Sequence, residues 1–236
     1  MNAEYGEGIV MAFLVAIEGI DGSGKGTQAN RLVAALRDAG VQTETMQFPR
    51  YAATNFGRAI GDFLNGRFGQ LGDVHPQLAA VLYAGDRFES RSALEQMMAT
   101  NDVVVLDRYV GSNLAHQAAK LDGEERSQLI DWIERVEFDV FGLPKANANI
   151  LIDMSSDWSR ELVSRKAARD YTDREADLQE ADTSYMERVR GCYQQIAAGR
   201  PDWHVVPGLS QSGELRQINE VGDQILQMVM QLNQPN

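Results

Sequence analysis

The sequence predicts an α/β fold in which a five-stranded, mostly parallel β-sheet carries helices on both faces. Two observations lead to this prediction. Short apolar segments alternate along the chain with longer segments of helical periodicity, as in consecutive βαβ units. A glycine-rich turn ending in Lys25 joins the first apolar segment to the first helical one. Because parallel strands align their carboxyl ends, we expect ligands to bind at that edge of the sheet.

Each strand is predicted from an apolar run, and each helix from apolar residues spaced three and four apart. The first run, at 12–18, is apolar nearly throughout, which is typical of a central strand buried on both faces. The other predicted strands are at 41–48, 103–106, 149–153 and 203–206. Helical spacing follows the glycine-rich turn as far as Gly40 and recurs at 54–65, 76–98, 122–141 and 215–232, and a long charged stretch covers 155–198.

Composition excludes several classes of protein. With 44% hydrophobic residues in 236, the chain has enough apolar surface for a core, and disorder over most of its length is excluded. A single cysteine, Cys192, rules out an internal disulfide framework and favours a cytoplasmic location. No apolar run approaches the ~20 residues of a membrane span, and a net charge of −12 argues against nonspecific nucleic-acid binding. We expect residues 1–11 to be a loose extension and 12–236 a single domain.

The glycine-rich turn matches the phosphate-binding pattern G-x-x-x-x-G-K in the required context, directly after a strand and before a helix. Glycines let backbone N–H groups surround a phosphate, and the lysine adds a positive charge. The alternative is an ordinary glycine turn, but the lysine and both flanking elements favour a P-loop NTPase-type fold. We assign ATP binding to the whole loop: Gly19, Ile20, Asp21, Gly22, Ser23, Gly24, Lys25, Gly26 and Thr27.

Basic and aromatic residues near this edge indicate a second phosphate-bearing substrate. Several arginines converging on one phosphate loop suit bidentate contacts to two substrates. Each group taken alone has another explanation: a surface stacking pair, solvated helix charges or a solvated basic face. The candidate residues are Phe48-Pro49-Arg50-Tyr51, Tyr83 with Asp86-Arg87, Asp107-Arg108-Tyr109 with Ser112 and Asn113, and the basic cluster Arg165, Lys166, Arg169 and Arg174.

These motifs, together with Gly142-Leu143-Pro144-Lys145, resemble thymidylate kinases of the nucleoside monophosphate kinase superfamily from about Phe13 to Val206. The resemblance implies transfer of the ATP γ-phosphate to dTMP, giving dTDP and ADP. It also implies a homodimer and a mobile lid over about 160–180. The expected contacts to thymine are Phe48, Tyr83 stacked on the ring, and Arg87 and Asn113 on its polar edge, and those to the dTMP phosphate are Arg50, Tyr51 and Arg108.

Further roles follow from the same resemblance. Ser112 is expected at the substrate site, and Asp21, Asp177 and Glu180 near the sugar or a magnesium ion. His116 stands where the family usually has an aromatic residue thought to exclude a 2′-hydroxyl. Gly26 replaces the usual Ser or Thr ligand of Mg²⁺, as in adenylate kinases. We therefore expect Mg²⁺ to bind mainly through nucleotide phosphates and water, with Asp21 or Glu180 as a possible protein ligand.

Phosphoryl transfer requires positioning and charge neutralisation more than covalent chemistry. We expect Lys25, Arg108 and the lid arginines Arg165 and Arg169 to neutralise the transferring group, and Asp107 to orient Arg108 rather than act as a base. The alternatives are a kinase for another nucleoside monophosphate or for a deoxynucleoside, or a GTPase-like switch. The last would need a guanine-recognition sequence N-K-x-D, which the chain lacks.

Overall fold

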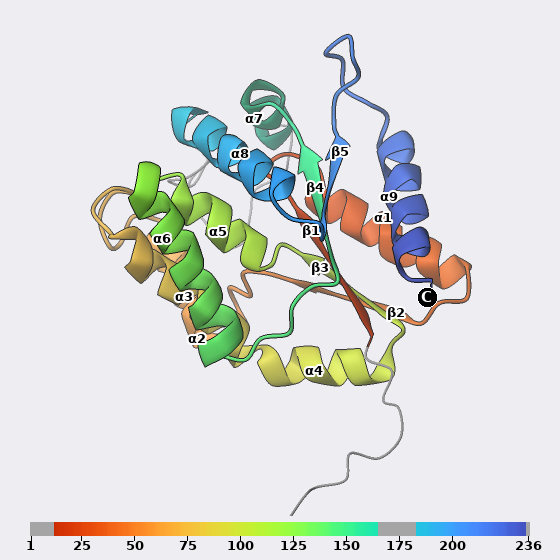
Figure 1. Ribbon diagram of the computed structural model, residues 1–236, viewed down its shortest axis with the longest axis horizontal. Coiled ribbons are helices and arrows are strands. Elements are labelled where there is room, and N and C mark those ends of the chain that lie inside the picture. The colour runs from red at the N-terminus through yellow and green to blue at the C-terminus, as the bar shows by residue number, and fades with distance from the viewer. Residues whose placement is uncertain (1–11, 165–182, 235–236) are drawn as a thin grey trace, which may run out of the picture.

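The five predicted strands form one sheet, and every pairing in it is parallel (Figure 1). The computed structural model describes residues 12–164 and 183–234. In the sheet the strands follow the order β2-β3-β1-β4-β5, so β1 is central, as its apolar sequence predicts. Their bounds are β1 Phe13–Glu18, β2 Thr43–Gln47, β3 Val103–Asp107, β4 Ala148–Asp153 and β5 Trp203–Pro207.

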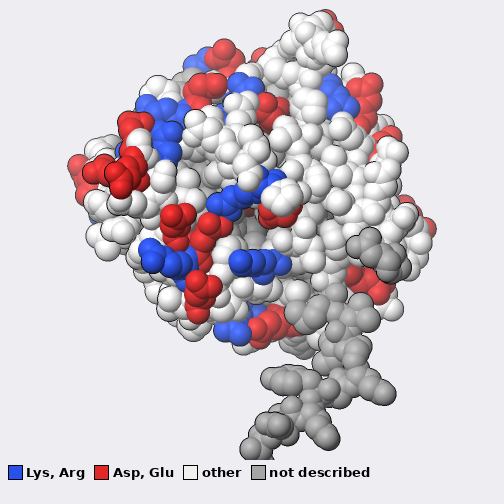
Figure 2. Space-filling model, in the orientation of Figure 1, with Lys and Arg blue, Asp and Glu red and all other residues white. Residues whose placement is uncertain are grey.

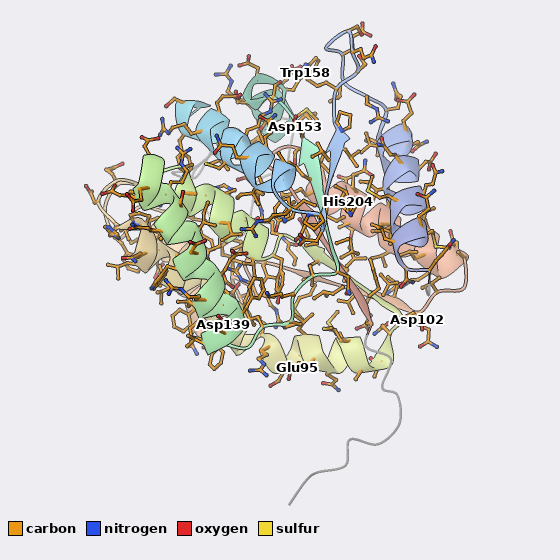
Figure 3. All side chains as sticks on the ribbon, in the orientation of Figure 1. Glu95, Asp102, Asp139, Asp153, Trp158 and His204 are labelled. Atoms are coloured by element: carbon orange, nitrogen blue, oxygen red, sulfur yellow. The ribbon has the colours of Figure 1, made fainter. Side chains whose placement is uncertain are left out.

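The strand register brings the carboxyl ends together at one edge. Asp107, the last residue of β3, pairs with Ile17 of β1 and Gln47 of β2. At the other side of the sheet Asp153 of β4 pairs with Pro207 of β5. Figure 3 labels Asp153 at this carboxyl edge and Asp102, which directly precedes β3, at the opposite edge. The segments that leave the strands at the carboxyl edge therefore share one region.

Alternate residues of each central strand pack against different helices, which accounts for the two layers of core. Val15 and Ile17 of β1 belong to the core formed with α1 (Lys25–Asp38) and α9 (Ile218–Leu232). Leu14 and Ala16 belong to the core on the other face. The helices of that second face include α5 (Val110–Ala118), α6 (Gly123–Glu134) and α8 (Thr183–Ala198) (Figure 1).

The remaining helices lie around this frame. Helix α2 (Asn55–Leu64) packs against α3 (Pro76–Glu89) in a small separate core around Phe63. Helix α7 (Ser156–Ser164) follows β4, and α6 continues into a π-helical segment, η1 (Arg135–Val140). The described helices include none long and apolar enough to cross a membrane. On the face shown in Figure 2, the described acidic and basic side chains are interspersed rather than gathered into one basic surface.

The expectation of one helix over 76–98 is wrong, because the chain forms two helices that meet at Ser90. Helix α3 ends at Glu89, and α4 (Arg91–Thr100) runs in a new direction (Figure 1). The Ser90 hydroxyl donates to the carbonyl of Asp86 (2.8 Å) and accepts from the side chain of Arg50 (3.2 Å). Serine competes in this way with the regular helical hydrogen bonds, and the break follows.

Two other segments also differ from the pattern-based expectation. Helix α5 was not predicted as an element, although it carries several of the candidate site residues. The helix expected over 122–141 is present, but its last part widens into η1, where the amide of Phe141 bonds the carbonyl of Val136 (2.9 Å). Apolar spacing alone does not distinguish such a turn from a regular α-helix.

Candidate active site

The glycine-rich turn forms an open cradle at the start of α1. Gly24 precedes the helix with φ 91° and no side chain caps the first turn, so the N–H groups there are available to an anion. Gly22 (φ 79°) lies so close to α7 that an added Cβ would stand 2.3 Å from the carbonyl oxygen of Ser159. The loop thus needs glycine for its backbone conformation and for its packing.

Lys25 is buried at the centre of this loop, and its ammonium group donates to the carbonyl of Ile20 (2.7 Å). Burial, together with the positive charge of Arg108, lowers the pKa of Lys25 to about 7, although Asp21 and Asp107 act in the opposite direction. A bound phosphate would supply the negative charge that this desolvated ammonium lacks. The geometry therefore fits a lysine that becomes fully charged against a nucleotide phosphate.

Asp107 lies close to position 26 of the loop, where the general pattern has Ser or Thr. A Cβ on Gly26 would lie 2.9 Å from the Oδ2 atom of Asp107, so a larger residue there would require the carboxylate to move. Asp107 makes no hydrogen bond to Arg108 within the described part of the chain and acts on it only through its charge. The carboxylate of Asp107 lies beside Gly26 of the phosphate loop. The expected role of Asp107 in orienting Arg108 is therefore not supported by a hydrogen bond between the two described side chains.

Arg108 bridges the phosphate loop and helix α5. Its guanidinium forms an ion pair with Asp21 and donates to the carbonyl of Gly19 (3.3 Å) and to the hydroxyl of Ser112 (3.2 Å). Burial alone would lower the pKa of Arg108, but the charge of Asp21 raises it well above its usual value. Arg108 has φ 67°, the one left-handed non-glycine residue in the described chain, and such strained residues cluster at functional sites.

A cavity of about 470 Å³, including its open mouth, lies beside Arg108. The sequence-predicted residues from the loops that line it are Asp21, Phe48, Tyr51 and Arg108. Those from the helices are Tyr83 and Arg87 of α3 and Ser112, Asn113 and His116 of α5. Most of the predicted acceptor residues in the described chain are therefore brought together from segments far apart in the sequence, around one opening.

Arg50 is the predicted acceptor residue that does not line this cavity. Its guanidinium donates to Ser90, and its backbone amide donates to Oδ2 of Asp86 (2.9 Å). Asp86 also accepts from the hydroxyl of Thr54, so it anchors the segment that follows β2. The alternative that Asp86 and Arg87 are solvated helix charges is wrong, since their side chains are 0% and 2% exposed.

Arg87 and Asn113 are held together by hydrogen bonds to a third residue, Glu137, which was not among the predicted site residues. Both donate to the buried carboxylate of Glu137 on η1, Arg87 through two nitrogens. Burial alone would lower the pKa of Arg87, and Glu137 raises it above its usual value. Glu137 lies 50 positions from Arg87 in the chain, and no local pattern signals such a contact.

His116 and Gln117 present unpaired nitrogens beside the cavity. The Nδ1 atom of His116 lies 3.4 Å from the hydroxyl of Tyr185, while Nε2 has no partner among the described residues, so the alternative of a fully satisfied helix histidine does not hold. Gln117 was not predicted. Its Oε1 accepts from Lys120 (2.9 Å), and its buried Nε2 has no described partner. Its position four residues after Asn113 on one helix face was the available signal.

A second buried carboxylate, Glu18, fixes the helix that carries these groups. It accepts from the backbone amides of Tyr109 (2.8 Å) and Ser112 (3.1 Å), from the Ser112 hydroxyl (2.6 Å) and from Tyr193 (2.9 Å). Ser112 lines the cavity, but its hydroxyl is already used inside the protein. A glutamate ending an apolar strand was the signal that sequence analysis left unused.

The candidate lid residues lie outside the described part of the chain. This applies to both proposed catalytic arginines, Arg165 and Arg169, and to Asp177 and Glu180. Within residues 12–164 and 183–234, no group of three or more His, Cys, Asp or Glu side chains gathers as a metal cage.

Comparison with known proteins identifies the relatives of this chain. The family model described as thymidylate kinase matches residues 17–218. A thymidylate kinase of Mycobacterium tuberculosis is 35% identical over 185 residues, 78% of this chain and 86% of the relative. One of Bifidobacterium longum is 32% identical over 208 residues, 85% of this chain and 91% of the relative. The solved structure of the Candida albicans thymidylate kinase superposes with a TM-score of 0.69 at 23% identity, covering 95% and 94% of the two chains, which supports the same fold.

His116 gives a test of the buried site by pH. Burial, then the charge of Arg108, lowers its pKa from 6.5 to about 3. Between these values the unfolded chain binds more protons than the folded one, so this residue makes the free energy of unfolding decrease as pH falls from 6.5. We expect this contribution to approach about 1.4 kcal/mol per pH unit. Urea unfolding measured from pH 4 to 8 gives the free energy of unfolding at each pH. This free energy should depend less steeply on pH in His116→Gln than in the unaltered protein. The same pH dependence in both proteins would contradict the assignment.

Proposed function

The chain belongs to the thymidylate kinase family and transfers the γ-phosphate of ATP to dTMP, and we propose which residues carry out each part of that reaction. The ATP phosphates bind the loop from Gly19 to Thr27, against the open first turn of α1 and the ammonium of Lys25. Lys25, whose pKa is lowered by burial in the free protein, contacts the phosphoryl group that is transferred.

We propose that dTMP occupies the cavity beside Arg108. The thymine ring lies between Phe48 and Tyr83, with its polar edge toward Arg87 and Asn113. The unpaired Nε2 of Gln117 is a further group available to the base, and that of His116 to the sugar. The acceptor phosphate lies at the other end, near Tyr51 and Arg108. Arg50, whose guanidinium donates to Ser90 outside the lining of the cavity, supports this end by its charge.

In the transfer step an oxygen of the dTMP phosphate forms a bond to the γ-phosphorus, and the bond to the β–γ bridging oxygen of ATP breaks. The acceptor oxygen is already anionic near neutral pH, so the reaction needs no general base. Arg108 contacts the phosphate loop on one side and α5 on the other, which supports a role for its charge between the two substrates. Arg165 and Arg169 of the proposed lid, at about 160–180, complete the neutralisation.

The residues beside Lys25 fit a magnesium ion bound with ATP. Carboxylate oxygens are the protein ligands that Mg²⁺ prefers, and it keeps most of its bonds to water and substrate phosphates. The carboxylates of Asp21 and Asp107 both lie near enough to Lys25 to raise its pKa, and the described residues form no closed metal cage. We propose Asp21, Asp107 and Glu180 as the candidate protein contacts. The ion would neutralise phosphate charge.

The observation that carries the proposal is the position of Arg108, with the phosphate loop on one side and the acceptor cavity on the other. An ADP-release assay with dTMP, dUMP, UMP, AMP, CMP, GMP and thymidine tests it. We expect dTMP to be preferred and thymidine to be inert. Arg108→Ala should lower kcat about 10²–10³-fold, as for other preorganised charge contacts.

A matched pair of asparagine variants tests the base end of the cavity. Asn113→Ala removes a buried acceptor that faces the proposed thymine position, so the KM for dTMP should rise about tenfold or more while that for ATP stays unchanged. Asn101→Ala, near the amino edge of the sheet where the side chain bonds Met97, should leave both constants unchanged. Equal KM values for dTMP in both variants would contradict the assignment of Asn113.

The lowered pKa of Lys25 predicts that the protein takes up a proton when it binds the nucleotide. Its pKa of about 7 in the free protein rises when phosphates arrive, so at pH 8 binding of Mg-ATP should take up about one proton. Titration calorimetry in buffers of different ionisation enthalpy measures this number. Lys25→Met should abolish the uptake. Lys120→Met should retain it, although burial lowers the pKa of Lys120 to about 8. Uptake that persists in Lys25→Met would assign the proton to another group.

We also propose a cytoplasmic homodimer formed through α3 and η1. Leu78 and Phe88 of α3 and Val140 of η1 are exposed by 64%, 48% and 72%, and the rings of Phe88 and Phe141 pack at a tilt with their centroids 4.8 Å apart. Exposed apolar side chains on these two neighbouring helices support an interface there.

Light scattering on two charge variants tests the dimer. Leu78→Glu places a charge in the proposed interface and should give a monomer. Ile218→Glu alters an equally apolar residue on α9, which is 55% exposed, and should stay dimeric. A dimer in both variants, or a monomer in the unaltered protein, would contradict this interface.

A further inference from the structure

Glu137 is a buried carboxylate that touches both residues proposed to contact the base. Its Oε2 accepts from Nε of Arg87 (2.6 Å), and its Oε1 accepts from Nη2 of Arg87 (2.5 Å) and from Nδ2 of Asn113 (2.8 Å). The exposed fractions are 0% for Glu137 and 2% for each of the other two. Removing a charge from such a dry cluster leaves its partner uncompensated, so the three side chains hold one arrangement.

The π-helical segment places this carboxylate. The helical ladder widens at η1, where Phe141 bonds Val136 (2.9 Å) and Leu143 bonds the carbonyl of Glu137 (3.0 Å). Within the same turn Glu137 is completely buried while Val140 is 72% exposed. Such single-turn insertions occur frequently at functional sites, and here the segment places a buried carboxylate against two residues that line the cavity, Arg87 and Asn113.

Glu137 determines which way the amide of Asn113 faces. The Nδ2 atom of Asn113 lies between two groups that only accept, the carboxylate of Glu137 and the carbonyl of Ala80 (3.1 Å). The amide oxygen is therefore the atom left over. It is buried, it has no partner among the described residues, and its side chain lines the cavity. Asn113 thus offers a bound base an acceptor and not a donor.

The same carboxylate leaves Arg87 as a donor next to that acceptor. Two N–H groups of Arg87 point to Glu137 and one to the carbonyl of Tyr109 (3.4 Å). A guanidinium has five N–H groups, so two remain for a ligand. A donor beside an acceptor complements the O4 and N3–H of thymine or uracil. Cytosine presents an amino group and an unprotonated N3 at the same two positions, and both would face a group of like kind.

We propose that Glu137 is a specificity-determining positioning residue: by holding Arg87 and orienting the Asn113 amide, it makes the cavity select a keto pyrimidine over an amino pyrimidine. The inference rests on the proposed placement of the thymine edge against Arg87 and Asn113. It goes beyond that placement by naming Glu137, which contacts Arg87 and Asn113 and so determines which donor and acceptor atoms they offer to the base.

Glu137→Gln tests the proposal, because it keeps the shape of the side chain while removing its charge and one acceptor. We expect the ratio of kcat/KM for dTMP to that for dCMP to fall about 10–100-fold, as a misplacement of about 1 Å at a binding group does. The change should lie mainly in the KM for dTMP, with kcat less affected. Glu137→Asp retains the charge and should recover part of the ratio, a rescue that a space-filling role would not produce.

Glu134→Gln is the matched control. Glu134 ends α6 just before η1 and forms its own two-bond ion pair with Arg200 (2.5 and 3.0 Å), away from the acceptor cavity. Breaking that pair should leave the dTMP to dCMP ratio unchanged. If Glu134→Gln lowered the ratio as much as Glu137→Gln, the effect would come from loss of helix stability and the proposal would be overturned.

The double variant Arg87→Gln/Glu137→Gln keeps the experiment decisive if the single variant does not fold, because it leaves no unpaired buried charge. Because Glu137 acts through both Arg87 and Asn113, the double variant should discriminate between dTMP and dCMP no better than Arg87→Gln alone. Better discrimination in the double variant than in Arg87→Gln would overturn the proposal. A folded Glu137→Gln with the unaltered ratio would overturn the proposal. If Arg87→Gln and Asn113→Ala also left the KM for dTMP unchanged, the proposed thymine position itself would be wrong, so the two failures are distinguishable.

Discussion

The carboxylate of Glu18 is the contact on which the rest of the site depends. It ends the central strand at the carboxyl edge and accepts four hydrogen bonds, two of them from backbone amides at the start of α5 and one from Tyr193 of α8. A buried carboxylate stays stable only when its oxygens are satisfied in this way. Because Glu18 fixes the first turn of α5, it also fixes the direction in which Asn113, His116 and Gln117 face the cavity.

The basic side chains of the site fall into two kinds, the arginines that are paired with carboxylates and the buried Lys25. Arg108 already has Asp21 and Arg87 already has Glu137, so both guanidinium groups are oriented before any ligand arrives. Lys25 differs, because burial lowers its pKa and, among the described residues, its one hydrogen bond is to a carbonyl. In the proposed mechanism the paired arginines supply geometry, and Lys25 supplies a charge that develops fully with the phosphates.

Local pattern was sufficient for the sheet and the phosphate loop. Apolar runs gave all five strands, and the loop glycines and Lys25 lie adjacent in the sequence. The contacts of Glu18 and Glu137 span up to 175 positions and depend on the packing of helices, so periodicity could not reveal them. The break at Ser90 and the π-helical turn that carries Glu137 were not predicted either, because apolar spacing does not reveal the hydrogen bonds of the Ser90 hydroxyl or the wider backbone ladder of η1.

A crystal structure with dTMP and a non-hydrolysable ATP analogue tests the central claim, that the acceptor cavity is built in advance around two buried carboxylates. The account predicts the thymine edge against Arg87 and the amide oxygen of Asn113, the triphosphate on the loop around Lys25, and the contacts of Glu18 and Glu137 unchanged. A base bound outside the cavity, or Arg87 separated from Glu137 in the complex, would contradict it.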